Sequence, residues 1–347
     1  MTINLYASEV SIERQDSGYA YAYGMVSGMH PRILSRKDID SMINMENIQE
    51  VLNSLRKTDY AREIEETPKE FSDKDLDKAA CGNFMRAFKT IADSIPEEDR
   101  ASFSLMVLGE ADLNNMKTIM RGLKARAGKE EVRMMLRQGS IPTEDLELLI
   151  GQNSVEELVS KIMRLEVWPT EGLENALIEF KKSESLIPLE MALDRMLIER
   201  WLSNKPLQDY VKMRIDLTNM LNLFRCKTAG IKYENYIIQD GLHLSKKVLE
   251  EISEASGDDM VKALSGTPYG GAIEKAVSNG ISLLRIENSL EEFLQEEVAM
   301  KAMLNPLSIW PALALMQLKQ RENRNVRMML LMKAHNKSSE AVRNAMD

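Results

Sequence analysis

The chain has 347 residues, 44% of them hydrophobic and 29% charged, which is typical of a globular protein rather than a disordered one. Its 17 Gly and 10 Pro, set against 24 Met, favour helices over a turn-rich all-β fold. A net charge of −9 argues against a general nucleic-acid-binding protein, because such proteins usually have a basic excess. No nucleic-acid partner is therefore predicted.

The start of the chain, MTINLYASEVSIERQDS, has charges where a signal peptide needs an apolar core. No stretch approaches the roughly 18 uncharged apolar residues of a membrane-spanning helix. Cys81 and Cys226 lie far apart and form no CxxC pair, which favours buried, unpaired thiols in a reducing compartment. We therefore expect a cytoplasmic protein.

The first marker along the chain is a predicted helix that ends at an aromatic residue, and it occurs three times. In residues 41–60, apolar residues at helical spacing lead to Thr58 and Tyr60. Residues 148–168 repeat the pattern and end at Trp168, and residues 250–269 end at Thr267, Pro268 and Tyr269.

The second marker is a helix that begins with an acid, followed three positions later by an asparagine. It reads DLNNMKTIMR at 112–121, DLTNMLNLFR at 216–225 and ENRNVRMMLL at 322–331. The acids are 104 and then 106 residues apart. The last position is arginine in the first two copies and Leu331 in the third. The repeated polar residues are Asp112, Asn115, Asp216, Asn219, Glu322 and Asn325.

These markers predict an all-α protein of three similar helical units, called repeats, at 1–128, 129–232 and 233–347. From the closing aromatic to the next acid there are 52, 48 and 53 residues, so the two markers keep one order and one period. No run of alternating β-branched residues indicates a sheet. Helical repeats with a shared buried face can stack on their neighbours.

Together with the opening YAYAYGMVSGMHPRIL, the markers resemble the C subunit of archaeal A-type ATP synthases. That protein is similar to the d subunit of eukaryotic V-type ATPases, in the AC39 family. The resemblance covers residues from about Tyr19 to Asn336. Two features depart from it: the first sixteen residues match nothing in the family, and the third repeat has Leu331 in place of the arginine.

The resemblance implies a pseudo-threefold funnel of three helical units in the central stalk of a proton- or sodium-translocating ATP synthase. The implied partners are the proteolipid rotor ring and the central axle subunits. The implied role is mechanical, with neither catalysis nor a cofactor, and the implied location is peripheral, at the cytoplasmic face of the membrane.

A search for chemistry in the sequence gives no competing site. There is no GxxxxGK[ST] phosphate loop, and GTPYGG at 266–271 is predicted to be a turn. His30, His243 and His335 lack metal-binding spacing, so neither a metal site nor a catalytic residue is predicted. The methionine excess favours core filling over an adaptable groove. Without the resemblance, three alternatives stay open: an adaptor of another complex, a helical enzyme with an unrecognised site, and a solenoid scaffold.

The repeated polar residues have two structural interpretations. Buried hydrogen bonding is favoured, and setting the register between repeats is the alternative. At about 100° per residue, Arg121 and Arg225 lie about 140° from the centre of the apolar stripe, and Arg324 lies at about 160°. These arginines are candidates for a positive ring that faces a partner. The alternative, which we favour for each of them, is a solvated surface arginine.

Overall fold

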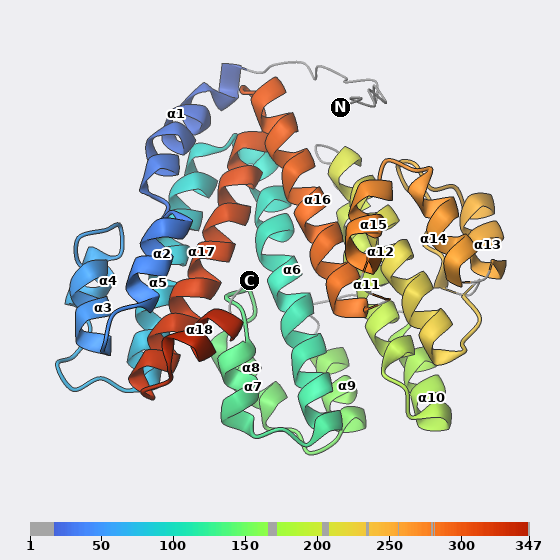
Figure 1. Cartoon of the computed structure of the whole chain (residues 1–347), viewed down its shortest axis with the longest axis horizontal. Coiled ribbons are helices and arrows are strands. Elements are labelled where there is room, and N and C mark those ends of the chain that lie inside the picture. Colours follow the sequence, from blue (N-terminus) through green and yellow to red (C-terminus); the bar gives the residue numbers. More distant parts are fainter. Residues whose placement is uncertain are drawn as a thin grey trace. The chain divides into compact units, whose positions relative to one another are not determined.

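The computed structural model describes residues 17–165, 172–202, 208–233, 236–255, 257–278, 280 and 282–345. Every regular element in these ranges is a helix, and no strand occurs among them, which confirms the all-α prediction (Figure 1). Within the same ranges, no helix combines the length and the apolar character needed to cross a bilayer. The first sixteen residues and Trp168 lie outside the described residues.

The chain divides into two compact bodies. Of the described residues, those within 112–135 and 141–301 form lobe 1, and those within 17–111, 136–140 and 302–345 form lobe 2. Two of the boundaries fall inside helices, at 111/112 in α6 (Glu97–Ala125) and at 301/302 in α16 (Leu283–Leu304), whereas the predicted repeat boundaries at 128 and 232 fall between helices. The division into three repeats remains a prediction.

Lobe 2 is organised around the pairing of two long helices, α5 and α17, which pack along each other (Figure 1). Its core combines apolar residues from positions 39–80 with Val326, Met329, Leu330 and Val342. Besides the first part of α6, its helices are α1 (Ala20–Met29), α2 (Arg36–Ile43), α3 (Ile48–Leu55), α4 (Ala61–Glu65), α5 (Asp73–Ser94), α17 (Trp310–Ala334) and α18 (Ser339–Ala345), with the 3₁₀ turns η1 (Ser17–Tyr19) and η2 (His30–Arg32).

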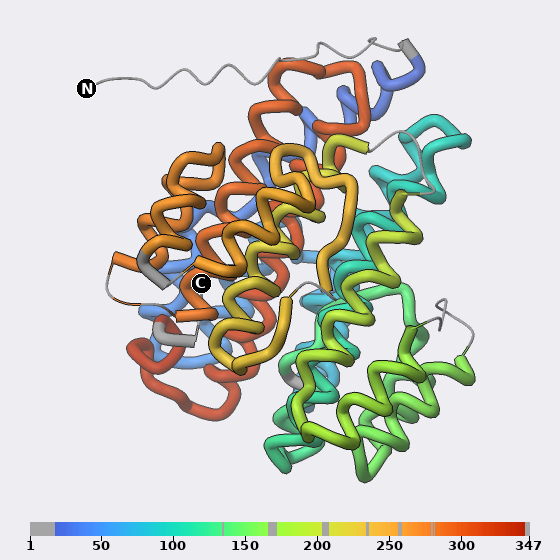
Figure 2. Tube along the Cα trace, turned by 90° about the vertical axis from the view of Figure 1, so that its right-hand side faces the viewer, coloured from blue at the N-terminus to red at the C-terminus, as the bar shows by residue number. Residues whose placement is uncertain are grey.

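Lobe 1 continues from α6 through a series of helices in which α10, α11 and α12 pack in succession (Figure 2). Its helices are α7 (Lys129–Met135), α8 (Thr143–Ile150), α9 (Val155–Arg164), α10 (Leu173–Ser183), α11 (Ile187–Leu202), α12 (Gln208–Ala229), α13 (Lys246–Glu254), α14 (Gly257–Ser265), α15 (Gly270–Val277) and α16 (Leu283–Leu304).

Local sequence determines where several of these helices start. Ser35 and Asp38 form a capping box at α2, in which each side chain binds the backbone N–H of the other residue. Ser72 and Asp75 do the same at α5. Such caps satisfy N–H groups that the first turn of a helix leaves without an intrahelical partner.

The aromatic marker has the same local structure in the two copies that are described. Thr58 Oγ1 donates to the Leu55 carbonyl at 2.7 Å and accepts from the Tyr60 N–H at 3.2 Å. Thr267 makes the equivalent pair of bonds, at 2.6 Å and 3.3 Å, with Leu264 and Tyr269. Both tyrosines are buried and stand directly before a new helix. The turn predicted at GTPYGG is confirmed.

Candidate functional site

The repeated acids are buried and bind backbone outside their own helices, and Asp216 shows this most fully. Its carboxylate accepts from the N–H groups of His243 at 2.7 Å and Leu244 at 3.3 Å, and from the Tyr269 hydroxyl at 2.7 Å. Burial raises the pKa of Asp216, although these three hydrogen bonds act in the opposite direction. Asp216 on α12 therefore fixes the segment before α13 and the start of α15.

Asp112 and Glu322 make contacts of the same kind. Asp112 is fully buried on α6 and accepts from the Ile141 N–H at 3.1 Å. Glu322 on α17 accepts from the Leu34 N–H at 2.9 Å and from Lys319 Nζ at 2.7 Å. Burial, and next the charge of Glu322, raises the pKa of Tyr60. The third acid thus lies beside the first aromatic marker, as Asp216 lies beside the third.

The asparagines follow the pattern in lobe 1 and depart from it in lobe 2. Asn219 binds both backbone groups of Ile238, donating to its carbonyl at 2.8 Å and accepting from its N–H at 2.9 Å. Asn115 is also fully buried. Asn325, by contrast, is only partly buried, and the buried amide on α17 is Asn323, which donates to the Ala80 carbonyl at 2.6 Å. The third repeat therefore has its buried amide one position after the acid.

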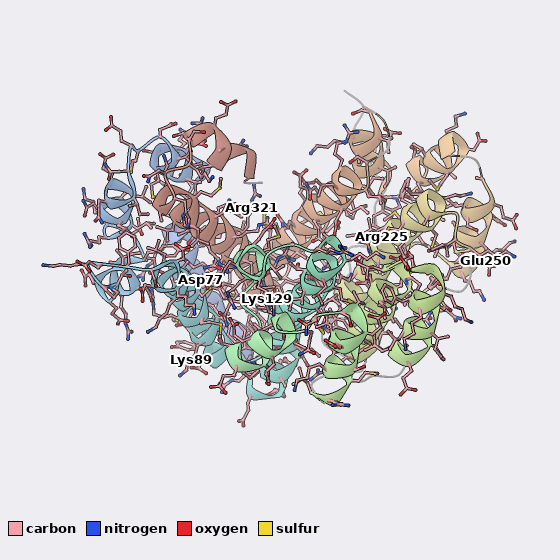
Figure 3. The ribbon with its side chains drawn as sticks, turned by 90° about the horizontal axis from the view of Figure 1, so that it is seen from below. Asp77, Lys89, Lys129, Arg225, Glu250 and Arg321 are labelled. Atoms are coloured by element: carbon pink, nitrogen blue, oxygen red, sulfur yellow. The ribbon has the colours of Figure 1, made fainter. Side chains whose placement is uncertain are left out.

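Two of the three candidate arginines meet in a charged cluster of lobe 1. Arg121 binds Glu190 through two hydrogen bonds, Nε to Oε1 at 2.7 Å and Nη2 to Oε2 at 2.8 Å. Arg225 Nη1 lies 3.9 Å from Glu190 Oε2 and 3.8 Å from Asp194 Oδ2. Figure 3 labels Arg225 among the helices of this lobe. The charged cluster consists of Lys117, Arg121, Glu190, Asp194, Arg225 and Glu287.

The cluster holds three basic and three acidic groups, so its formal charges cancel. Lys117 Nζ lies 2.5 Å from Asp194 Oδ1, and both side chains are buried. Burial opposes ionisation of Glu190, but its bonds to Arg121 and the charges of Arg121, Lys117 and Arg225 lower its pKa overall. Hydrogen bonding to Glu190 likewise raises the pKa of Arg121.

Arg225 is not a solvated surface arginine, because only 7% of the residue is exposed. The angle of Arg225 from the apolar stripe would place it in solvent only if α12 had one solvent-exposed face. Buried residues occur all around α12, which is enclosed by other helices. Arg121 has a side chain that is 48% exposed, and Arg324 on α17 is partly buried.

Lys117, Glu190 and Asp194 were not predicted from the sequence. The available signal was the pair of acids four positions apart in LEMALDRML, where all the other residues but Arg195 are apolar. Residues four apart lie on the same helix face, and acids are rarely buried without a partner. That combination indicates basic partners on a neighbouring helix.

The remaining candidates for chemistry serve other contacts. His335 Nε2 lies 2.8 Å from Asp73 Oδ2, and the His243 ring packs against the edge of Tyr269. Cys81 and Cys226 are free thiols, and burial raises the pKa of Cys81 to about 12. Within the described ranges, no three His, Cys, Asp or Glu residues are placed to hold a metal ion.

The fold and the recurring sequence motif define the class: an all-α protein whose marked polar residues stabilise its own packing. The family model described as "ATP synthase (C/AC39) subunit" matches residues 22–345, so the chain belongs to this family. The resemblance noted in the sequence is confirmed. The family is a non-catalytic accessory subunit of ATP synthase, and the chain is accordingly not an enzyme.

Individual relatives agree with this assignment. The chain is 27% identical over 313 residues to the A-type ATP synthase C subunit of Methanobrevibacter smithii, covering 85% of this chain and 79% of the relative. It is 26% identical over 342 residues to the protein of the same name from Methanococcoides burtonii, covering 94% of each chain.

Proposed function

We propose that this protein is the central-stalk adaptor of an archaeal A-type ATP synthase, where it couples the membrane rotor ring to the central axle. The match over residues 22–345 to the ATP synthase (C/AC39) subunit family supports this proposal most directly. The relatives that span nearly the whole chain are named as C subunits of A-type synthases. ATP synthesis and ion transport are then properties of the complex.

The proposed role requires resistance to torque, and the contacts within each lobe suit that requirement. In lobe 1, the charged cluster joins α6, α11, α12 and α16. In lobe 2, Glu322 and Asn323 of α17 bind backbone at Leu34 and Ala80. Ion pairs and hydrogen bonds between helices have a fixed geometry, and they therefore oppose sliding of one packed helix along another.

The proposal places the protein at the cytoplasmic face of the membrane, held there by protein contacts. The end of α16 offers one apolar contact surface, because Met303 is 80% exposed and Leu304 is 41% exposed. Exposed apolar side chains that lie together commonly mark interaction sites. The proteolipid ring and the axle subunits are the proposed partners.

Affinity purification of the tagged protein from native membranes tests the proposal. We expect proteolipid ring subunits and axle subunits to co-purify in constant ratio after mild detergent extraction. Recovery of the catalytic head together with peripheral-stalk subunits, without the ring or the axle, would assign the chain to another position in the complex.

We further propose that Arg121 and Arg324 contribute positive charge toward an acidic partner, whereas Arg225 is excluded because it is buried beside Glu190, Asp194 and Glu287. Arg121 is the most direct candidate, since its side chain is 48% exposed although it is paired with Glu190. Arg121→Gln is expected to weaken assembly with the neighbouring stalk subunits and to reduce its salt dependence. Arg62→Gln on exposed α4 is the control. Unchanged affinity and an unchanged salt slope would show that Arg121 acts only within the charged cluster.

A further inference from the structure

A cavity of about 200 Å³ lies in lobe 2 between α1, η2, α5 and α17. Its apolar wall includes Met25, Met29 and Met316, whose flexible side chains adapt to the shape of what they contact. Its polar wall includes Arg32, Arg86 and Lys319, with Asp59 as the acid among the lining residues. The cavity therefore joins an adaptable apolar surface to a group of cations.

One face of α1 extends this cavity into an exposed stripe. Residues 21, 24, 25, 28, 29 and 32 follow helical spacing, and all but Tyr21 line the cavity. The adjacent face of α1 is buried through Ala22 and Val26. A Cβ atom built on Gly24 or on Gly28 would meet no atom within 4 Å. The two glycines, one turn apart, leave the backbone of α1 open to close approach.

Two cations of the cavity retain hydrogen-bonding capacity, although Arg86 is also ion-paired with Asp59 and Glu63. Arg86 uses Nε for Glu63 at 2.7 Å and Nη2 for the Asp59 carbonyl at 2.6 Å, while its Nη1 bonds to no residue that the structure describes. Arg32 is exposed and pairs with no described acid. Lys319 is 4% exposed, and its ammonium group already contacts Glu322 at 2.7 Å, Asp59 at 4.0 Å and the Tyr60 ring at 4.8 Å, so the available donors are those of Arg32 and Arg86 Nη1. Free N–H donors of this kind match a carboxylate, which only accepts hydrogen bonds.

We propose that this cavity and the exposed face of α1 form a docking site for a helix of a protein partner, which presents an Asp or Glu side chain to Arg86 and Arg32. A helix fits because two glycines one turn apart let another helix backbone approach closely, as small residues do at close helix crossings. A volume of about 200 Å³ is also below the 300–1,000 Å³ that is usual for small-molecule pockets, so a side chain fills it better. The site does not depend on the central-stalk assignment.

Selection from a display library of helical peptides of about four turns tests the site on the full chain. The library is selected on the wild-type protein alone, and the enriched peptides are then titrated against Gly28→Leu. Leucine at position 28 adds helix propensity, and its side chain would enter the cavity. The matched control is Ser27→Leu, at an exposed neighbouring position outside the cavity lining.

We expect the selected peptides to carry Asp or Glu on the binding face. In titrations with the most enriched peptide, Gly28→Leu should weaken binding about tenfold or more, and Ser27→Leu should change it less than about twofold. Replacing the acid of the peptide by its amide should weaken binding by a similar factor. Arg32→Gln should weaken binding, whereas Arg36→Gln, outside the cavity lining, should not.

Three results would overturn the proposal. One is selected peptides that lack an acid, or that bind Gly28→Leu as well as the wild type. Another is binding of hexanoate that equals the binding of the peptide, which would indicate a small-anion pocket. The third is an empty selection together with Gly28-dependent binding to phosphatidylglycerol vesicles, which would assign the face to a membrane surface.

Discussion

Two buried carboxylates of lobe 1 have pKa values shifted in opposite directions, because burial raises both values but only Glu190 has cationic partners that outweigh it. Glu190 faces Arg121, Lys117 and Arg225, and its pKa is lowered from the ordinary 4.5. Asp216 accepts only from neutral donors, and burial raises its pKa from 3.8. Ionised Glu190 therefore stabilises the fold above pH 4.5, and this contribution is lost as the pH falls through its lowered pKa. The contribution of Asp216 is complete below pH 3.8 and is lost as the pH rises through its raised pKa.

We predict that Glu190→Gln lowers the free energy of unfolding by about 3 kcal/mol near neutral pH, because it leaves Arg225 buried without a full counter-charge. The difference from the wild type should shrink as the pH falls below 4.5. Urea unfolding across a pH series measures both effects. Glu251→Gln, an exposed acid in an i,i+4 pair, should change stability by less than about 0.5 kcal/mol. A deficit that does not change with pH would show that Glu190 acts by packing alone.

At the scale of elements, two adjacent glycines after the turn between α14 and α15 differ in how much space surrounds them. A Cβ atom on Gly270 would lie 2.3 Å from the Ser265 carbonyl oxygen, whereas one on Gly271 would meet nothing within 4 Å. Because the obstacle at Gly270 is backbone, a small side-chain adjustment cannot relieve it.

Gly270→Ala is therefore expected to lower the free energy of unfolding by more than about 2 kcal/mol, since the turn that positions Tyr269 must shift. Gly271→Ala, at an exposed helical position, should be neutral or stabilise the fold by up to about 1 kcal/mol. Thermal and chemical unfolding of both variants give the comparison. Equal effects of the two substitutions would contradict the close contact at Gly270.

The helices and the two markers could be predicted because each depends on local sequence. The spacing of apolar residues predicts the buried face of each helix. Thr58 and Thr267 form the same turn, because each bonds to a leucine three residues before it. The surroundings of each helix could not be predicted, because they depend on partners distant in sequence. Arg225 is buried since neighbouring helices enclose α12, and Asn323 takes the buried amide position on α17, one position after the acid. The charged cluster needed α6, α11, α12 and α16 together.

At the scale of the whole molecule, the isolated chain is predicted not to bind ATP. The glycine-rich segment 266–271 uses its own N–H groups: Thr267 bonds to the Leu264 carbonyl, Tyr269 to Thr267 Oγ1, and Gly270 to the Thr267 carbonyl. Phosphate-binding loops need such groups free to point at the ligand. Calorimetric titration with Mg-ATP should give no binding at micromolar concentration. Micromolar binding that substitutions in 266–271 abolish would contradict the prediction.

The make-up of lobe 2 also affects the order in which the chain can fold on the ribosome. Its core joins residues 39–80 to Val326, Met329, Leu330 and Val342, and Leu34 and Ile43 bind side chains at 322 and 339. Residues 17–111 leave the ribosome first but cannot complete their core until residues 302–345 have been synthesised. Lobe 1 lies between these segments and needs no such delay. Its helices can therefore finish folding first, while the apolar faces of α2, α3 and α5 stay uncovered until α17 is made, which is the interval in which the chain is most prone to aggregate.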